Sequence, residues 1–183
     1  LRPWVAQADW LLDIHSMHEP SAPLLLTGIQ PRNLALARAM RSPEHIVVDA
    51  GHKDGVRMRD YGRFGALEDS NGNDTRSLLI ECGFHGDPAS RAVAQDQCVR
   101  FIEQSGALSA DALAQQLPGW RLPDAPRQGA LEVTGPEKAG TVIGDNDGVP
   151  VVTPYDDCVL VMPSVRQARA GVTVVRFARR RLL

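Results

Sequence analysis

Three short apolar runs, each followed at once by polar residues, constrain the fold of this chain more than any other feature. They are WLLDI at 10–14, HIVVDA at 45–50 and SLLIEC at 77–82. Runs of this length that are rich in apolar and β-branched residues are typical of buried β-strands. Residues 31–40 and 87–104 carry apolar side chains at helical spacing instead. Strands interleaved with helices predict an α/β domain.

The chain changes character after residue 117. Pro118, Pro123 and Pro126 mark a linker-like stretch. Short β-rich runs separated by turn residues follow it, at 130–133, 141–143, 149–152, 158–162 and 172–177. The sequence Asn-Asp-Gly at 146–148 is typical of a tight turn between two strands. We therefore expect an α/β domain over residues 1–120 and a small all-β domain over residues 121–183.

The composition restricts the classes of function that this chain can have. The 183 residues carry a formal net charge of −2, from 20 basic and 22 acidic side chains, which argues against binding to nucleic acid or a membrane surface. No apolar run reaches the roughly 20 residues that a membrane helix needs. The 3 cysteines are far apart and form no Cys-x-x-Cys pair, so neither a thiolate metal site nor a disulfide framework is expected. A reduced, cytoplasmic setting is the prediction.

The first candidate site follows the run at 10–14. Asp13 stands two residues before His15, and Ser16 and His18 come next. Histidine is the commonest neutral zinc ligand, and a carboxylate beside a metal-bound imidazole orients its ring. These residues therefore suit metal ligation at a strand end, the alternative being an ordinary hydrogen-bonded histidine.

The second candidate is Glu81, a carboxylate within the apolar run SLLIEC. Burying such a group is costly unless it is paired or used. One interpretation is a general base acting on a metal-bound water, and the other is a structural salt bridge, for instance to Arg76. Cys82 is expected to face the opposite side of the strand, as an inert buried thiol.

Both candidates lie at the ends of predicted strands, and in a mostly parallel sheet such ends share one edge. His15 and Glu81 at that edge are the minimum set for metal-assisted hydrolysis. His18 and His85 are close enough to the same edge in sequence to contact a substrate.

Two further features of the sequence are His45 and the stretch from Gly51 to Asn73. His45 begins a predicted strand and is interpreted as structural. The polar stretch from Gly51 to Asn73 is long for a compact domain, which suggests the hypothesis that it closes over a substrate. The chain contains no Gly-x-Ser-x-Gly elbow, Walker loop or Gly-x-Gly-x-x-Gly motif.

Residues 8–16, ADWLLDIHS, resemble the AD-x-x-x-D-[LI]-H-[ST] stretch of the succinylglutamate desuccinylase and aspartoacylase family, zinc-dependent amide hydrolases of the zinc carboxypeptidase clan. LIECG at 79–83 resembles the family's [IV]-E-x-G strand. PYDD at 154–157, with VMP at 161–163, resembles its terminal β-domain. The implied fold is α/β, a mixed sheet with flanking helices of the zinc carboxypeptidase kind, followed by a small all-β domain.

The resemblance implies a role for individual residues. His15 would be the third zinc ligand, Asp13 would support it, and Glu81 would be the catalytic base and acid. Tyr155 would help hold the substrate, alongside Ser16, His18 and His85 as weaker candidates. The implied cofactor is Zn²⁺, and the implied substrate is an N-acyl amino acid or a similar small acylated amine.

One departure from the family pattern qualifies this prediction. The family carries an H-x-x-E pair of zinc ligands before the position of His15, and no histidine precedes His15 here. The expectation is a chain that lacks the N-terminal part of the catalytic domain and exposes a sheet edge open to association with a second copy. The alternative function is a non-catalytic module of the same fold that binds a small acid or a partner chain.

Overall fold

The computed structural model describes residues 1–51, 55–67, 74–119, 138–164, 166, 169 and 171–180. The chain divides into two compact units, Leu1–Gly129 and Ala130–Leu183. The expected boundary between residues 120 and 121, and the expected strand at 130–133, lie outside the described residues and stay predictions.

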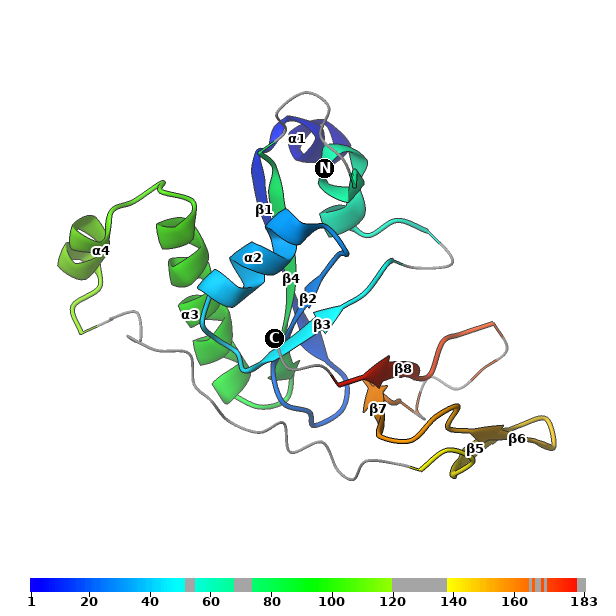
Figure 1. Cartoon of the computed structure of the whole chain (residues 1–183). Helices are drawn as coiled ribbons and strands as arrows, with labels where there is room; N and C mark the ends of the chain where they lie inside the picture. Colours follow the sequence, from blue (N-terminus) through cyan, green and yellow to red (C-terminus); the bar gives the residue numbers. More distant parts are fainter. Residues whose placement is uncertain are drawn as a thin grey trace. The chain divides into compact units, whose positions relative to one another are not determined.

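The first unit is built on a four-stranded sheet with the order β1-β4-β2-β3 (Figure 1). The strands are β1 (Trp10–Met17), β2 (Leu24–Thr27), β3 (His45–Val48) and β4 (Arg76–Phe84). β1 and β4 run parallel, and so do β2 and β3, but β2 is antiparallel to β4. The mixed α/β architecture is thereby confirmed.

The sheet is mixed, as the resemblance implied, with two parallel strand pairings and one antiparallel pairing. The connection between β1 and β2 gives the physical reason for the antiparallel pairing. Only residues 18–23 join these two strands. A crossover between parallel strands needs about a dozen residues or more, so a connection this short obliges β2 to run back in the opposite direction. β1 and β4 therefore run in one direction, and β2 and β3 run in the other.

Some helices of the first unit begin at residues that favour a helix start. The helices are α1 (Arg2–Gln7), α2 (Pro31–Ala39), α3 (Ala89–Gln104) and α4 (Ala110–Gln116), with short 3-10 turns η1 (Met58–Asp60) and η2 (Gly62–Gly65). Pro31 occupies the first turn of α2. The Ser109 hydroxyl accepts a hydrogen bond of 3.2 Å from the Ala112 amide, which caps α4.

One face of the sheet packs against α2 and α3 and forms the core of the unit. The Trp10 and Phe101 rings meet edge to face at 5.7 Å on this side. Alternate residues of β4 point into the same cluster, so the residues between them, Leu79 and Glu81, face the other side. The buried core cluster consists of Leu25, Leu36, Ala37, Met40, Leu78, Ile80, Cys82 and Phe101.

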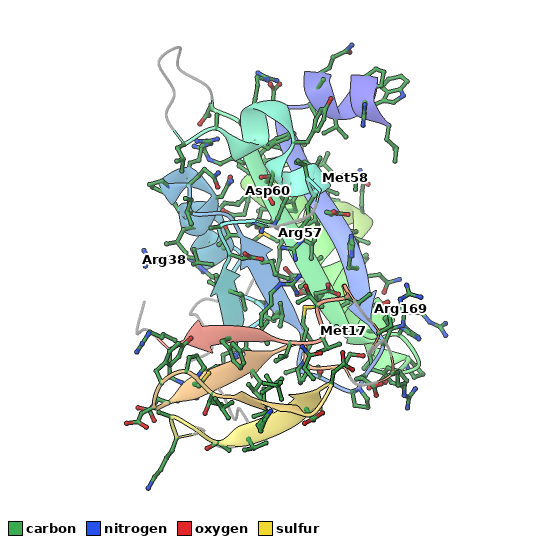
Figure 2. The ribbon with its side chains drawn as sticks, turned by 90° about the vertical axis from the view of Figure 1, so that its right-hand side faces the viewer. Met17, Arg38, Arg57, Met58, Asp60 and Arg169 are labelled. Carbon is green, nitrogen blue, oxygen red and sulfur yellow. The ribbon has the colours of Figure 1, made fainter. Side chains whose placement is uncertain are left out.

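The opposite face receives η1, which contacts β1 and β4. The Ser77 hydroxyl donates a 2.7 Å hydrogen bond to the carbonyl of Arg59, which fixes η1 near the start of β4. Figure 2 views the sheet from this side, with Arg57, Met58 and Asp60 over one part of the sheet and Met17 marking the far end of β1. β1 is an edge strand, with β4 as its neighbour in the sheet.

The second unit contains two antiparallel strand pairs within its described residues. β5 (Val142–Asn146) pairs with β6 (Val149–Val152), and β7 (Cys158–Val161) pairs with β8 (Arg176–Arg179). Asp147 and Gly148 have φ values of 53° and 83°, as a two-residue hairpin turn requires, so the expected turn is confirmed. The run expected at 172–177 forms its strand later, at β8. None of the described helices has the length and apolarity to span a bilayer.

Candidate functional site

His15 and Glu81 are direct neighbours across β1 and β4. The parallel register pairs Ile14 with Ile80 and His15 with Glu81. Paired residues on adjacent strands lie about 4.8 Å apart and point to the same face of the sheet. Because Ile80 belongs to the core, His15 and Glu81 both point to the face opposite α3. Residues distant in the sequence thus meet on one surface.

Asp13 lies on the same face as His15 because the two are separated by two positions along β1. Its Oδ1 atom is 3.0 Å from His15 Nε2. The Asp13 side chain is 8% exposed, whereas that of His15 is 48% exposed. A buried carboxylate therefore holds one nitrogen of an accessible imidazole, which leaves Nδ1 as the nitrogen that can bind an external group.

Glu81 is 6% exposed within β4, and the structure does not bring it together with Arg76. The two are five positions apart in one strand, so their side chains leave from opposite faces. Arg76 forms an ion pair with Asp74, and its guanidinium lies 5.9 Å from the centroid of the Trp10 ring. A salt bridge to Arg76 therefore does not account for Glu81.

Cys82 points into the core, as the strand alternation predicted. Burial, followed by the charges of Glu81 and Cys98, raises the pKa of its thiol to about 11. A thiol with so high a pKa is protonated near neutral pH and is a poor nucleophile. Cys82 is therefore part of the packing and not of the chemistry.

A β-bulge follows Glu81 in β4. The register moves from His15–Glu81 to Met17–Phe84, so β4 contains one residue more than β1 over this interval. Gly83 sits in the bulge with φ of +100°, a conformation that favours glycine. The extra residue places His18 and His85 directly after a paired position, and their rings meet edge to face at 5.0 Å.

The remaining candidates, Ser16 and Tyr155, belong to different units of the chain. Ser16 is exposed and alternates with His15 along β1, so its side chain leaves from the other side of the strand. Tyr155 belongs to the second unit, where the Arg179 guanidinium lies 3.7 Å from its ring centroid. Burial and the neighbouring Cys158 raise the pKa of Tyr155, although Arg179 opposes the shift.

The described part of the polar stretch, residues 55–67, packs at the start of β1 and β4. Arg63 donates to the carbonyl of Ala8, and Arg32 on α2 donates to the carbonyl of Phe64. His15 and Glu81 lie five positions further along their strands, about 16 Å away at the rise of a β-strand. These contacts argue against residues 55–67 closing over His15 and Glu81, while 52–54 and 68–73 lie outside the described residues.

An ionic cluster anchors this stretch. Asp49 accepts from the Gly51 amide at 3.0 Å and from Arg57 Nη1 at 2.9 Å. The fully buried Arg59 guanidinium lies 3.8 Å from Asp49 and 3.4 Å from Asp60. Burial alone would raise the pKa of Asp49, but the hydrogen bonds from Gly51 and Arg57 and the two positive charges hold it below its ordinary value.

His45 shares the row of His15 and Glu81, which the sequence did not indicate. Glu81 pairs with Leu24 in the antiparallel direction, and Leu24 pairs with His45. The order across the sheet is therefore His15, Glu81, Leu24, His45, all on one face. Only the strand register places His45 in this row. The sequence around His45 is that of an ordinary strand start and gives no sign of it.

The described donors of this row do not make up a metal site by themselves. Across residues 1–51, 55–67, 74–119 and the described part of the second unit, no group of three or more His, Cys, Asp or Glu side chains is placed to hold a metal ion. A catalytic zinc site takes about three protein ligands. The described residues thus fit one ligand position with its supporting carboxylate, and they do not form a complete site.

No protein-family model matches the chain, and no curated protein matches its sequence. The fold is similar to the crystal structure of a succinylglutamate desuccinylase/aspartoacylase from Rhodobacter sphaeroides, with a TM-score of 0.54 at 17% sequence identity. The match covers 95% of this chain and 58% of that protein. The likeness is one of fold, over little more than half the length of the solved protein.

Proposed function

We propose that the first unit carries part of the active site of a zinc-dependent deacylase that cleaves the amide bond of N-acyl amino acids or similar small acylated amines. The observation that supports this most is the pairing of His15 with Glu81 on adjacent parallel strands, with Asp13 bound to the His15 ring. The fold likeness to a succinylglutamate desuccinylase/aspartoacylase agrees with it.

Each of these side chains has a distinct task in the proposal. His15 offers Nδ1 as one zinc ligand, and Asp13 holds the ring in place through Nε2. Bound zinc would polarise the amide carbonyl and lower the pKa of a water molecule. The proposal requires further ligands from outside the described residues.

Glu81 is the proton-transfer group. Its carboxylate accepts a proton from the attacking water and then delivers it to the amide nitrogen, so that the C–N bond breaks to give a carboxylate and a free amine. The side chain is 6% exposed, and this restricts its exchange of protons with bulk water. Its position beside His15 in the register keeps the base next to the metal ligand.

The test combines metal content with hydrolysis. The full chain is dialysed against trace metal, its zinc is measured by elemental mass spectrometry, and release of free amine from N-succinyl and N-acetyl amino acids is followed. His15→Ala should lose hydrolysis and one zinc ion per chain, and Glu81→Gln should keep its zinc but lose hydrolysis. Zinc content and hydrolysis that are both indifferent to His15→Ala would contradict the proposal.

A second candidate function is a non-catalytic module that binds a small acid without metal. The absence of a three-donor cluster from the described residues is the observation that favours it. Calorimetry with an N-acyl amino acid in the presence of a chelator separates the two functions. Binding that persists under chelation, without hydrolysis in zinc-loaded protein, would favour the module.

A further inference from the structure

We propose that His18 and His85 form a second metal site, separate from His15, which binds a divalent transition-metal ion through two imidazoles. The two residues follow the ends of β1 and β4, strands far apart in the sequence. Their ring centroids are 5.0 Å apart and their planes are at 89°.

This ring separation is the one that a shared metal would need. A zinc–nitrogen bond is about 2.1 Å long, and the ring centroid lies roughly 1.1 Å beyond the nitrogen. Two imidazoles on a tetrahedral ion therefore have centroids about 5 Å apart. The observed separation of 5.0 Å agrees with this distance.

A backbone hydrogen bond joins the two strand ends that carry His18 and His85. The His85 amide donates a 3.0 Å hydrogen bond to the Met17 carbonyl, which ties the two strand ends together beyond the bulge. The Phe84 ring lies 5.2 Å from that of His85, and a Cβ atom on Gly86 would meet the Phe84 ring at 2.5 Å. The Phe84 ring thus packs beside both His85 and Gly86.

The chemistry indicates the class of ligand. Neutral imidazoles suit Zn²⁺, Ni²⁺ and Cu²⁺, whereas Mg²⁺ and Ca²⁺ prefer oxygen. Both rings are exposed, so an ion can reach them from solvent. Within the part of the chain that the structure describes, no third His, Cys, Asp or Glu joins the pair. The remaining coordination positions would be open to water or to the carboxylate of a small acid.

The experiment uses the His15→Ala full chain, which removes the ligand of the proposed deacylase site and tests the pair by itself. ZnCl₂ is titrated calorimetrically into this variant and into His15→Ala/His18→Ala and His15→Ala/His85→Ala. We expect one zinc ion per chain in the first and binding at least about tenfold weaker in the other two. His15→Ala/His45→Asn is the matched control and should bind as His15→Ala does.

Cu²⁺ provides an independent readout of the ligand number. The electron paramagnetic resonance spectrum of the Cu²⁺-loaded His15→Ala chain should show the hyperfine splitting of two imidazole nitrogens, reduced to one in either double variant. Unchanged zinc affinity after loss of His18 or His85, or equal loss in the His45 control, would overturn the assignment. Neither result bears on the role of His15, because His15 is absent throughout.

Discussion

His15 Nε2 lies 3.0 Å from Asp13 Oδ1, and this contact determines which nitrogen of His15 faces outward. The Asp13 carboxylate is buried, whereas the His15 ring is half exposed. The buried carboxylate therefore holds the exposed ring in position. A pair of this kind presents one nitrogen of a histidine in a defined direction. The arrangement needs no distant residue, because both side chains come from one strand.

Removal of the Asp13 carboxylate should weaken zinc binding at His15. Asp13→Ala is expected to lower the affinity by about 10- to 100-fold because the ring loses its orienting hydrogen bond. Asp13→Asn should retain part of the affinity, since the amide oxygen can still accept. Competition with a fluorescent chelator measures the effect in a His18→Ala/His85→Ala background. Ser16→Ala serves as control, and equal affinity in Asp13→Ala and Ser16→Ala would refute the role of Asp13.

Substitution of Glu81 should separate metal binding from catalysis. Glu81→Gln preserves the shape of the side chain but cannot accept the proton of the attacking water, so kcat should fall by about 10²- to 10⁴-fold. Zinc content should remain that of the parent chain. The exposed Glu44→Gln is the control and should keep full activity. An active Glu81→Gln variant would mean that another group moves the proton.

Asp49 should make the stability of the first unit depend on pH in the acid range. Although burial opposes ionisation, the Gly51 amide, Arg57 and Arg59 hold its pKa below the ordinary 3.8 in the folded chain. As pH falls, the unfolded chain therefore takes up the proton first, and the stabilisation present above about pH 4 is lost below it.

Urea denaturation of the parent chain and Asp49→Asn between pH 7 and pH 3 tests this dependence. The variant should be less stable at pH 7, and the difference should shrink as the pH falls through the folded pKa. A difference that stays constant down to pH 3 would show that the charge of Asp49 contributes nothing.

Arg59 should stabilise the folded first unit through its ion pairs on the sheet face opposite α3. Its side chain is fully buried beside Asp49 and Asp60. Arg59→Met removes the positive charge and leaves two partly buried carboxylates, which should cost about 3 kcal/mol of unfolding free energy. Arg38→Met, an exposed position on α2 (Figure 2), should change the free energy by less than about 0.5 kcal/mol. Equal effects in the two variants, measured by urea denaturation, would contradict this role.

The sequence determined the local elements of this protein. The runs at 10–14 and 77–82 form strands and residues 31–39 form a helix. Ser109 caps the helix α4. Apolar periodicity, capping side chains and turn glycines act over a few residues, so they are readable without the fold. The sequence also indicated Asp13 and His15 as a pair, because their spacing on one strand already places them on one face.

Only the tertiary structure decided what lies beside that pair. The reversal of β2, the alignment of Glu81 with His15, and the presence of His45 in the same row all depend on which strands pair and in what register. The bulge at Gly83, which sets His85 against His18, is a property of two strands together. Register is fixed by hydrogen bonds and packing between segments far apart in the chain, and no local pattern encodes it.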